Sequence, residues 1–498
     1  MKLLEKTQDE IRILAGPQEE VERGEFLYLE DKIQQNKLIL QVMDVGYLNL
    51  EGSLDDIIRR ELLGDYDILE VDPNAHDGFS RKLQDLKEVK CKIRGEFSDN
   101  SFHLDFHHLP MRSRSEVAKA KINDLLGPRN ASQQGLIRIG KTKEGEAFHV
   151  RPEDLDGRLG LITGRKNSGK SHLAKILASA LVIRGAFVFV LDLNDEYLGL
   201  SSGTDGKESR LAKRIIPLSP GESLQFDVKY LGLDVMVEMM KHTLEMPTVS
   251  LREFSSIWNM LSAKGNLSLA TLETAIPSWR CNQFVKEALF SRFQSLKESN
   301  LFSDDVNRGV SFEELINNNS EGGMFVLSLG SLSSIARRVV VEVVLGKIMD
   351  LLKRQKIPPL FLFAEEAHTY VRETWWEDII TRMRHFGIFT TFVTNQPDAI
   401  GRGIYRQMDN IFLYNFNNEN DLDLLSQASA SDGITIRSLV KGLSKGSCLV
   451  LGDISNDLPL LVDIDDTELQ TLGKSRLFFK KQVEPIQTAR VVEGLANK

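Results

Sequence analysis

The sequence predicts an α/β protein with a mainly parallel sheet, an all-helical insertion and a small N-terminal β-barrel. Three observations lead to this fold class. Apolar runs alternate with amphipathic helices from Gly157 onward, which is typical of a parallel sheet covered by helices on both faces. Residues 231–305 show helical spacing without strand signals. Residues 1–110 offer short apolar runs broken by turn residues.

Length and composition limit the number of domains and the class of protein that are expected. The chain has 498 residues and a formal net charge of −9, so more than one domain is expected. It contains no apolar run of about 18 residues, the length of a membrane-spanning helix, and its start lacks the apolar core of a secretory signal. We therefore expect a cytoplasmic protein that does not enter the membrane. The acidic total argues against a protein coated with nucleic acid but leaves room for a basic channel.

The N-terminal region is expected to form the barrel over residues 1–110. The stretch "SEVAKAKINDLLG" then spaces its apolar residues roughly as a helix does and ends in glycine, which predicts a helix. "IRIGKTKEGEAFHV" predicts a hairpin, because turn residues separate two alternating runs. Two parts of one core, at 111–230 and 306–498, flank the helical insertion at 231–305, and the second part ends in a C-terminal tail.

Continuous apolar runs mark the strands of the core. "RLGLIT" comes first and is followed by a helix with Leu173, Leu177 and Leu181 on one face, ending at Gly185. "AFVFVLDL" and "RIIPL" follow, and strands resume after the insertion at "GGMFVLSL", "PPLFLFAEE", "IFTTFVT" and "NIFLYNF". The chain returns to β structure at "GSCLVLGD" and "LPLLVDI". Runs without polar alternation indicate strands buried on both faces.

The turn after the first core strand carries the pattern of a phosphate-binding loop. "GRKNSGKS" fits G-x-x-x-x-G-K-[ST] and lies between a strand and a helix, as the motif requires. Its glycines let backbone N–H groups face phosphate oxygens, and the helix N-terminus adds partial positive charge. Lys170 is predicted to reach the β and γ phosphates of ATP, and Ser171 to hold Mg²⁺. The alternative is a tight turn that binds nothing. The predicted nucleotide-binding residues are Gly164, Arg165, Lys166, Asn167, Ser168, Gly169, Lys170, Ser171 and His172.

A phosphate-binding loop of this kind needs an acidic strand end beside it. "PPLFLFAEEAH" supplies an apolar strand that ends in Glu365 and Glu366. We expect Glu366 to orient and activate the attacking water, and Glu365 to hold a Mg²⁺-bound water. The usual pair is Asp–Glu, so the carboxylate of Glu365 lies one methylene further from the backbone than that of the usual aspartate. The alternative is a solvated strand end with two exposed carboxylates.

A third polar strand end follows in "TTFVTNQPDAI". A polar side chain there could touch the γ-phosphate or its water, so the sheet would respond to the state of the nucleotide. Gln396 is the first candidate for this role and Asn395 the second. A simple turn introduced by Asn-Gln-Pro is the alternative.

These motifs, in this order, resemble the HerA branch of the HerA–FtsK superfamily of hexameric DNA-pumping ATPases. The phosphate loop, "LDLNDEY", "FAEEAH", "TRMRHFGIFTTFVTNQP" and "MDNIFLYNFNNENDLDLL" carry the resemblance. In the family's D-x-x-G-E-Y motif, Asp192, Glu196 and Tyr197 match, while Asp195 stands in place of glycine. "GEFLYLED" and "KIRG…LPMRSRSEV" resemble the family's HAS-barrel. The resemblance implies a RecA-like P-loop NTPase core, with the family's helical insertion at 231–305.

The resemblance also implies a homo-hexameric ring with ATP between neighbouring subunits. Each site then needs an arginine to stabilise the charge that develops on the γ-phosphate. The family's R-x-F-G motif places Arg384 first in this role, and Arg382 is the next candidate. Arg337 and Arg338 lie on a helix near the sheet. The alternative for any one of them is a surface ion pair.

Contacts with double-stranded DNA would come from lysines and arginines on channel loops, because a translocating ring grips phosphates without reading sequence. The candidates are Lys207, Arg210, Lys213, Arg214 and Arg372. The alternative for each is a solvated charged face.

The function that the resemblance implies is an ATP-driven DNA translocase or helicase. It would work with a separate nuclease or other effector protein, docked on the N-terminal barrel, in DNA end processing or antiphage defence. The alternative is a ring-shaped assembly ATPase that scaffolds and regulates an effector enzyme, with DNA pumping secondary. A coupling ATPase of conjugation or secretion is a third possibility, against which the missing membrane segment counts.

Overall fold

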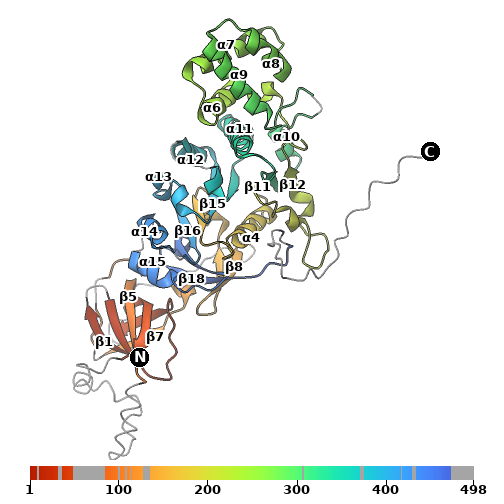
Figure 1. Ribbon diagram of the computed structural model, residues 1–498. Helices are drawn as coiled ribbons and strands as arrows, with labels where there is room; N and C mark the ends of the chain where they lie inside the picture. The colour runs from red at the N-terminus through yellow and green to blue at the C-terminus, as the bar shows by residue number, and fades with distance from the viewer. Residues whose placement is uncertain are drawn as a thin grey trace, which may run out of the picture.

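The computed structural model describes residues 1–7, 10–31, 36–48, 85–98, 101–106, 109–112, 114–126, 135–305, 308–370, 375–416, 418–428, 433–470 and 472. Over these residues the molecule is elongated, with three parts in a row (Figure 1). A curled antiparallel sheet lies at one end, a large sheet covered by helices in the middle, and a helical block at the other end. The predicted α/β class with a RecA-like core is confirmed.

The central sheet has eleven strands in the order β12-β13-β11-β14-β15-β10-β16-β17-β18-β8-β9. The strands from β12 to β16 in this order are parallel, and those from β17 to β9 continue the sheet in antiparallel fashion. The parallel strands are β10 (Gly160–Thr163), β11 (Phe187–Asp192), β12 (Ile215–Leu218), β13 (Gly323–Ser328), β14 (Leu360–Glu365), β15 (Ile388–Thr394) and β16 (Asn410–Leu413). The antiparallel strands are β17 (Ser447–Gly452), β18 (Leu460–Ile464), β8 (Ile137–Thr142) and β9 (Ala147–Val150), the last two being the predicted hairpin.

Both faces of the parallel strands are buried, as their continuous apolar runs predict. Val188 and Val190 of β11 face one hydrophobic core together with Leu177 of the first core helix. Phe189 and Leu191 of the same strand face the other core. Side chains alternate between the faces of a strand, so each strand contributes to both cores.

Helices cover the two faces of the sheet. The helix α4 (Lys170–Ile183) packs on one face, and α11 (Ser334–Lys353) belongs to the core of the other. The remaining helices of the core are α3 (Ile122–Leu125), α12 (Trp375–Phe386), α13 (Arg402–Tyr405), α14 (Glu419–Ala428) and α15 (Gly433–Val440).

The predicted helical insertion is present and packs on α11. Phe254 and Trp258 fill its interior with ring centroids 5.8 Å apart, whereas Trp279 is only partly buried and donates its indole N–H to Glu253. Its apolar residues join the core that α11 shares with the sheet, so the insertion is anchored through a common core. Its helices, with the adjoining short ones, are α5 (Val228–Leu231), α6 (Leu233–His242), α7 (Thr248–Ala263), α8 (Leu269–Ser278), α9 (Gln283–Lys297) and α10 (Phe312–Asn317).

The N-terminal region forms a curled antiparallel half-barrel with the strand order β1-β2-β5-β4-β3-β7, and β6 pairs with β5. Its edge strands β1 and β7 approach one another, which gives the sheet its curl. It has an apolar core of its own that includes Leu29, Leu40 and Val89. The strands are β1 (Lys2–Thr7), β2 (Glu10–Ala15), β3 (Phe26–Asp31), β4 (Lys37–Tyr47), β5 (Lys87–Ser98), β6 (Ser101–His103) and β7 (Ser115–Lys119).

The helix predicted for "SEVAKAKINDLLG" is wrong over most of its length. Ser115–Lys119 is the strand β7, paired with β3, and only Ile122–Leu125 is helical. Pairing with a strand distant in sequence outweighs the local helical spacing. The half-barrel therefore continues past residue 110.

The half-barrel is joined to the central sheet by a buried polar contact. Gln41 donates its amide N–H to the Pro459 carbonyl at 2.6 Å and accepts a hydrogen bond from Arg94 at 2.9 Å. Arg94 also reaches Thr435 on α15, at 2.9 Å. These bonds tie β4 and β5 to the antiparallel side of the central sheet. Among the described residues no helix has the length and apolar character to cross a membrane.

Candidate functional site

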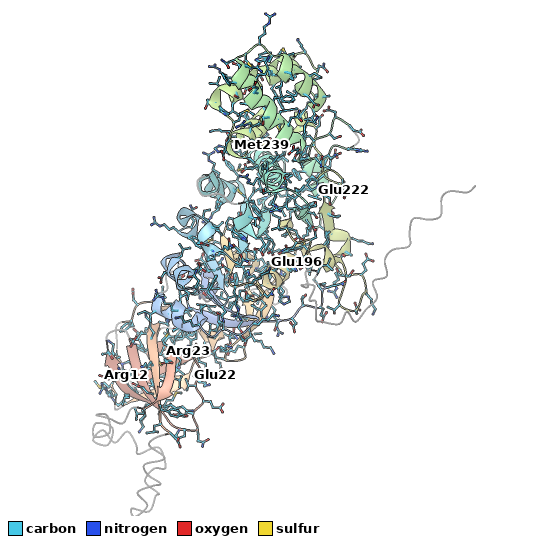
Figure 2. All side chains as sticks on the ribbon, viewed as in Figure 1. Arg12, Glu22, Arg23, Glu196, Glu222 and Met239 are labelled. Atoms are coloured by element: carbon cyan, nitrogen blue, oxygen red, sulfur yellow. The ribbon has the colours of Figure 1, made fainter. Side chains whose placement is uncertain are left out.

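The candidate site lies where the carboxyl ends of β10, β11, β14 and β15 meet. These strands are parallel neighbours, so the loops that follow them emerge at the same edge of the sheet. This is the edge at which open α/β sheets bind ligands. Glu196, which follows β11, is labelled in Figure 2 and lies in the middle of the molecule, between the half-barrel and the helical insertion marked by Met239.

The loop from Gly164 to Ser171 has the backbone that its glycines predict. Gly164 has φ +154°, and a Cβ there would lie 2.4 Å from the Cβ of Tyr414. Gly169 has φ +118° and caps α4 at its N-terminus. A side chain at Gly164 would therefore push the loop away from β16, and only glycine permits this close approach.

Lys170 is buried at the start of α4. Its ammonium donates to the Arg165 carbonyl at 3.0 Å, across the loop. Burial lowers the pKa of Lys170, because its charge has lost most of its water. A phosphate group bound in the loop would place a negative charge beside the Lys170 ammonium.

The other predicted residues of the loop divide into two groups. Arg165, Lys166 and Asn167 form its exposed tip, and Asn167 has a left-handed backbone. His172 lies in the first turn of α4, and its Nε2 is 2.9 Å from the Asp465 carbonyl. The imidazole of His172 is therefore held by the chain after β18, so any contact with nucleotide would come from its backbone.

Glu365 lies at the end of β14 and is almost fully buried. Its Oε2 accepts a hydrogen bond from the Ser171 hydroxyl at 3.1 Å, and its Oε1 accepts one from the Tyr197 hydroxyl at 2.6 Å. Burial raises the pKa of Glu365 to about 7, so near neutral pH a substantial fraction carries a proton. The sequence predicted that Glu365 and Ser171 act together, and the structure brings them into contact.

Glu366 turns out of the strand. Its φ of 47° is left-handed, which is rare for a side chain of this size, and it begins the short helix η4 (Ala367–Thr369). Its Oε2 is buried without a hydrogen-bond partner and lies 3.4 Å from Nδ1 of His368. A carboxylate oxygen that makes no hydrogen bond at this edge can accept one from a water molecule.

At the end of β15, Thr394 holds the turn that follows. Its hydroxyl accepts the Gln396 N–H at 3.0 Å and is 3.2 Å from His368 Nδ1. The side chain of Gln396 is exposed, whereas Oδ1 of Asn395 is buried without a partner. Of the two candidates, Asn395 therefore has the acceptor that faces inward here.

Residues after β11 complete the edge, and sequence reasoning did not assign them a role in the site. Tyr197 is fully buried, and burial raises its pKa well above the ordinary value, so its hydroxyl stays a donor. Its backbone N–H donates to Asp192 Oδ2 at 2.9 Å. Lys175 of α4, which is buried, forms an ion pair with the partly exposed Glu196 at 2.6 Å. The motif "LDLNDEY" could have indicated that these residues belong to the site, because it matches a family pattern.

The residues at this edge fit a nucleotide with Mg²⁺. The hydroxyls of Thr163 and Ser168 are buried without partners, as are the inward oxygens of Glu366 and Asn395. Unpaired buried polar atoms are costly in a folded protein and commonly mark a site that a ligand completes. Ser171 and Glu365 supply the hydroxyl and carboxylate oxygens that Mg²⁺ prefers.

Arg384 lies at the opposite edge of the sheet from the loop. Its guanidinium is 3.2 Å from Asp409, which also accepts the Leu159 N–H just before β10. The strand β10 separates that point from the phosphate loop by roughly 10 Å. Arg382 is exposed on the same helix. Arg337 lies instead on the P-loop edge, where it bonds the carbonyls of Leu329 and Leu332.

Three candidate DNA contacts line a cavity of about 650 Å³ at the amino ends of β12 and β13. They are Arg210, Lys213 and Arg214, with Glu208 and Glu321 among the other lining residues. Arg214 is already bonded to the carboxylate of Glu321 at 2.9 Å. Lys207 is exposed, and Arg372 lies outside the described residues.

Comparison with known proteins agrees with this geometry. Residues 161–348 match the family model for the central domain of helicase HerA. The DNA double-strand break repair helicase HerA of Saccharolobus solfataricus is 23% identical over 399 residues, covering 74% of this chain and 76% of the relative. Its counterpart in Sulfolobus acidocaldarius is 23% identical over 415 residues, covering 78% of each. The fold is similar to that of VirB4 of Thermoanaerobacter pseudethanolicus, with a TM-score of 0.51 at 13% identity, covering 68% of this chain and 98% of that one.

The geometry predicts distinct effects for two substitutions in the site. Lys170→Ala should lose nucleotide affinity, because it removes the buried cation that faces the loop. Glu366→Gln should keep nucleotide affinity but slow hydrolysis by about 10² to 10⁴ or more, the usual contribution of a positioned acid or base. Equilibrium binding of an ATP analogue and phosphate release would measure the two effects. Wild-type turnover by Glu366→Gln would show that another group activates the water.

Proposed function

We propose that this chain, a HerA-like P-loop ATPase, hydrolyses ATP with Mg²⁺ to move double-stranded DNA through a homo-hexameric ring. The observation that carries the proposal is the gathering of the loop, Glu365 and Glu366 at one sheet edge. The loop lies within residues 161–348, which match the HerA central-domain model, and the two glutamates lie after that segment, at the end of β14. The curated relatives, which are DNA double-strand break repair helicases, support DNA as the substrate of the motor.

The residues of the site divide the chemistry among them. Lys170 and the N–H groups at the start of α4 would bind the phosphates, Ser171 would hold Mg²⁺, and Glu365 would hold a water bound to that ion. When bound, Mg²⁺ neutralises charge on the β and γ phosphates and aligns them. Glu366 orients the attacking water through the oxygen that makes no hydrogen bond within the chain, and Asn395 or Gln396 senses the γ-phosphate end.

The position of Arg384 supports a ring. Within its own subunit the guanidinium is fixed near Asp409, at the edge of the sheet away from the phosphate loop. This distance from its own phosphate loop supports the proposal that Arg384 acts on a nucleotide bound by a neighbouring subunit. An arginine supplied in this way stabilises charge on the γ-phosphate and accounts for about 10³ to 10⁵ in rate in related NTPases.

Duplex DNA should raise the rate of ATP hydrolysis if the chain is a translocase. The measurement is phosphate release with and without linear double-stranded DNA, at low and at high salt, because phosphate contacts weaken as salt rises. Glu366→Gln is the control for contaminating ATPases. A rate that DNA leaves unchanged would favour the alternative, a ring that scaffolds an effector.

Mixed rings should reveal the arginine in trans. Arg384→Ala and Glu366→Gln subunits are each expected to be inactive alone, but together they form interfaces that join an intact Glu366 to an intact Arg384. Those interfaces should recover part of the hydrolysis. Arg382→Ala removes the second candidate, an exposed arginine on the same helix, and should stay active if Arg384 is the arginine that acts in trans. No recovery in verified mixed hexamers would exclude Arg384 as the arginine in trans.

The half-barrel is the part proposed to recruit a separate nuclease or other effector protein, in DNA end processing or antiphage defence. It lies outside the ATPase site and at the end of the molecule opposite the helical insertion (Figure 1). Its segment between β6 and β7 exposes Leu104, Leu109 and Met111, with 59% of Leu104 and 57% of Met111 accessible. The three side chains come from one short segment of the chain, and exposed apolar surface is typical of protein–protein contacts.

Substitution of this segment should therefore break the partnership without affecting the ATPase. Leu104→Asp with Met111→Asp is expected to abolish co-purification with an effector encoded beside this chain, while nucleotide binding stays intact. Phe284→Asp on α9 is the matched control, because Phe284 is 81% exposed on the helical insertion. If the effector remains bound to the Leu104–Met111 variant with full affinity, the interface lies elsewhere.

A further inference from the structure

The carboxylate of Glu365 is held at both of its oxygens. The Ser171 hydroxyl donates to Oε2 at 3.1 Å, and the Tyr197 hydroxyl donates to Oε1 at 2.6 Å. Tyr197 is fully buried, so its hydroxyl has no competing water. The carboxylate thus bridges a phosphate-loop hydroxyl on α4 and a phenol from the segment after β11.

A glutamate needs this second contact more than an aspartate would. Glu365 stands where P-loop ATPases usually have aspartate, and its longer side chain has one more rotatable bond between backbone and carboxylate. Each added torsion must be fixed before an oxygen is held in one place, and this costs conformational entropy. A hydrogen bond to the oxygen remote from Ser171 fixes the added torsion.

Tyr197 is itself held in place by its surroundings. Its backbone N–H donates to the buried Asp192 carboxylate at 2.9 Å, and the Lys175 ammonium lies 5.6 Å from the centre of its ring. Lys175 also pairs with Glu196, the residue before Tyr197. Tyr197 is therefore fixed by Asp192 at the end of β11 and by Lys175 of α4, the helix that also supplies Ser171.

We propose that Tyr197 is a positioning residue for the Mg²⁺-bound nucleotide: its hydroxyl fixes one oxygen of Glu365 and so presents the other to Ser171 and the ion. The inference rests on the proposed ATPase function and adds a residue to it. The role differs from simple packing, because it acts only on the part of nucleotide affinity that depends on Mg²⁺.

The chain contains a matched control in Tyr370. This tyrosine is also buried and also bonds Glu365, but its hydroxyl donates to the backbone carbonyl at 2.8 Å rather than to the carboxylate. Tyr370→Phe therefore deletes the same chemical group beside the same residue and leaves the carboxylate contacts in place. Any general effect of losing a buried phenol hydroxyl should be shared by both variants.

The experiment measures binding of a non-hydrolysable ATP analogue to the full chain by calorimetry, once with Mg²⁺ and once with excess EDTA. Tyr197→Phe is expected to lose about 10- to 100-fold in affinity with Mg²⁺, the usual effect of removing a group that orients a metal ligand. With EDTA its affinity should match that of the wild type. Tyr370→Phe should match the wild type under both conditions.

Several results would overturn the inference. These are an unchanged Mg²⁺ dependence in Tyr197→Phe, an equal loss with Mg²⁺ and with EDTA, or the same loss in Tyr370→Phe. A wild-type chain that binds no analogue under either condition would instead refute the nucleotide site itself. The two failures are therefore distinguishable.

Glu365→Asp tests the same contact by changing its acceptor. It provides a second variant if Tyr197→Phe does not fold. A carboxylate shortened by one methylene cannot meet both the Tyr197 and Ser171 hydroxyls, so Mg²⁺-dependent affinity should fall while affinity in EDTA is kept. In the Glu365→Asp background, Tyr197→Phe should cause no further loss, because the contact is already absent. Full Mg²⁺ dependence in Glu365→Asp, or additive losses in the double variant, would contradict the role of Tyr197.

Discussion

Burial of the Glu365 carboxyl group is the constraint on which the site depends. A buried carboxylate is tolerated only when hydrogen bonds replace the water that it has lost. Ser171 and Tyr197 supply those bonds, from α4 and from the segment after β11. The parallel order β11-β14-β15-β10 is what allows this, because the ends of neighbouring strands bring the two donors to one point. Fold and chemistry are therefore set by the same strand order.

Sequence reasoning succeeded where a feature depends on local pattern. The loop after β10 needs glycine at positions with left-handed or unusual backbone, so Gly164 and Gly169 could be assigned from their spacing alone. Glu365 and Glu366 could be placed because an apolar run of strand length ends at them. The hairpin of β8 and β9 followed from alternation and a turn. Each of these features is determined by about ten consecutive residues of the sequence.

Features decided by distant contacts were harder to predict. The stretch Ser115–Lys119 has apolar spacing compatible with a helix, but it is recruited as a strand by pairing with β3, far away in sequence. The contact of Tyr197 with Glu365 joins residues that are 168 positions apart, and no spacing rule links them. The edge of the sheet on which Arg384 lies could, by contrast, have been predicted from the order of strands and helices. A helix that follows a parallel strand returns to the opposite edge, so a residue near its end lies away from the phosphate loop.

Two residues with left-handed backbone lie close in sequence to the Tyr197–Glu365 contact. Asp195 and Glu366 both adopt left-handed φ values, 54° and 47°, in the segments that follow β11 and β14. Such conformations cost on the order of 1–3 kcal/mol for a residue other than glycine. At Asp195 the resembling family has glycine, for which this backbone carries no such cost, and aspartate tolerates it better than most side chains. At Glu366 the proposed role in orienting the attacking water requires a carboxylate, which a small residue does not supply. The chain therefore keeps a strained turn there, because an extended residue after Glu365 would point to the opposite face of the sheet.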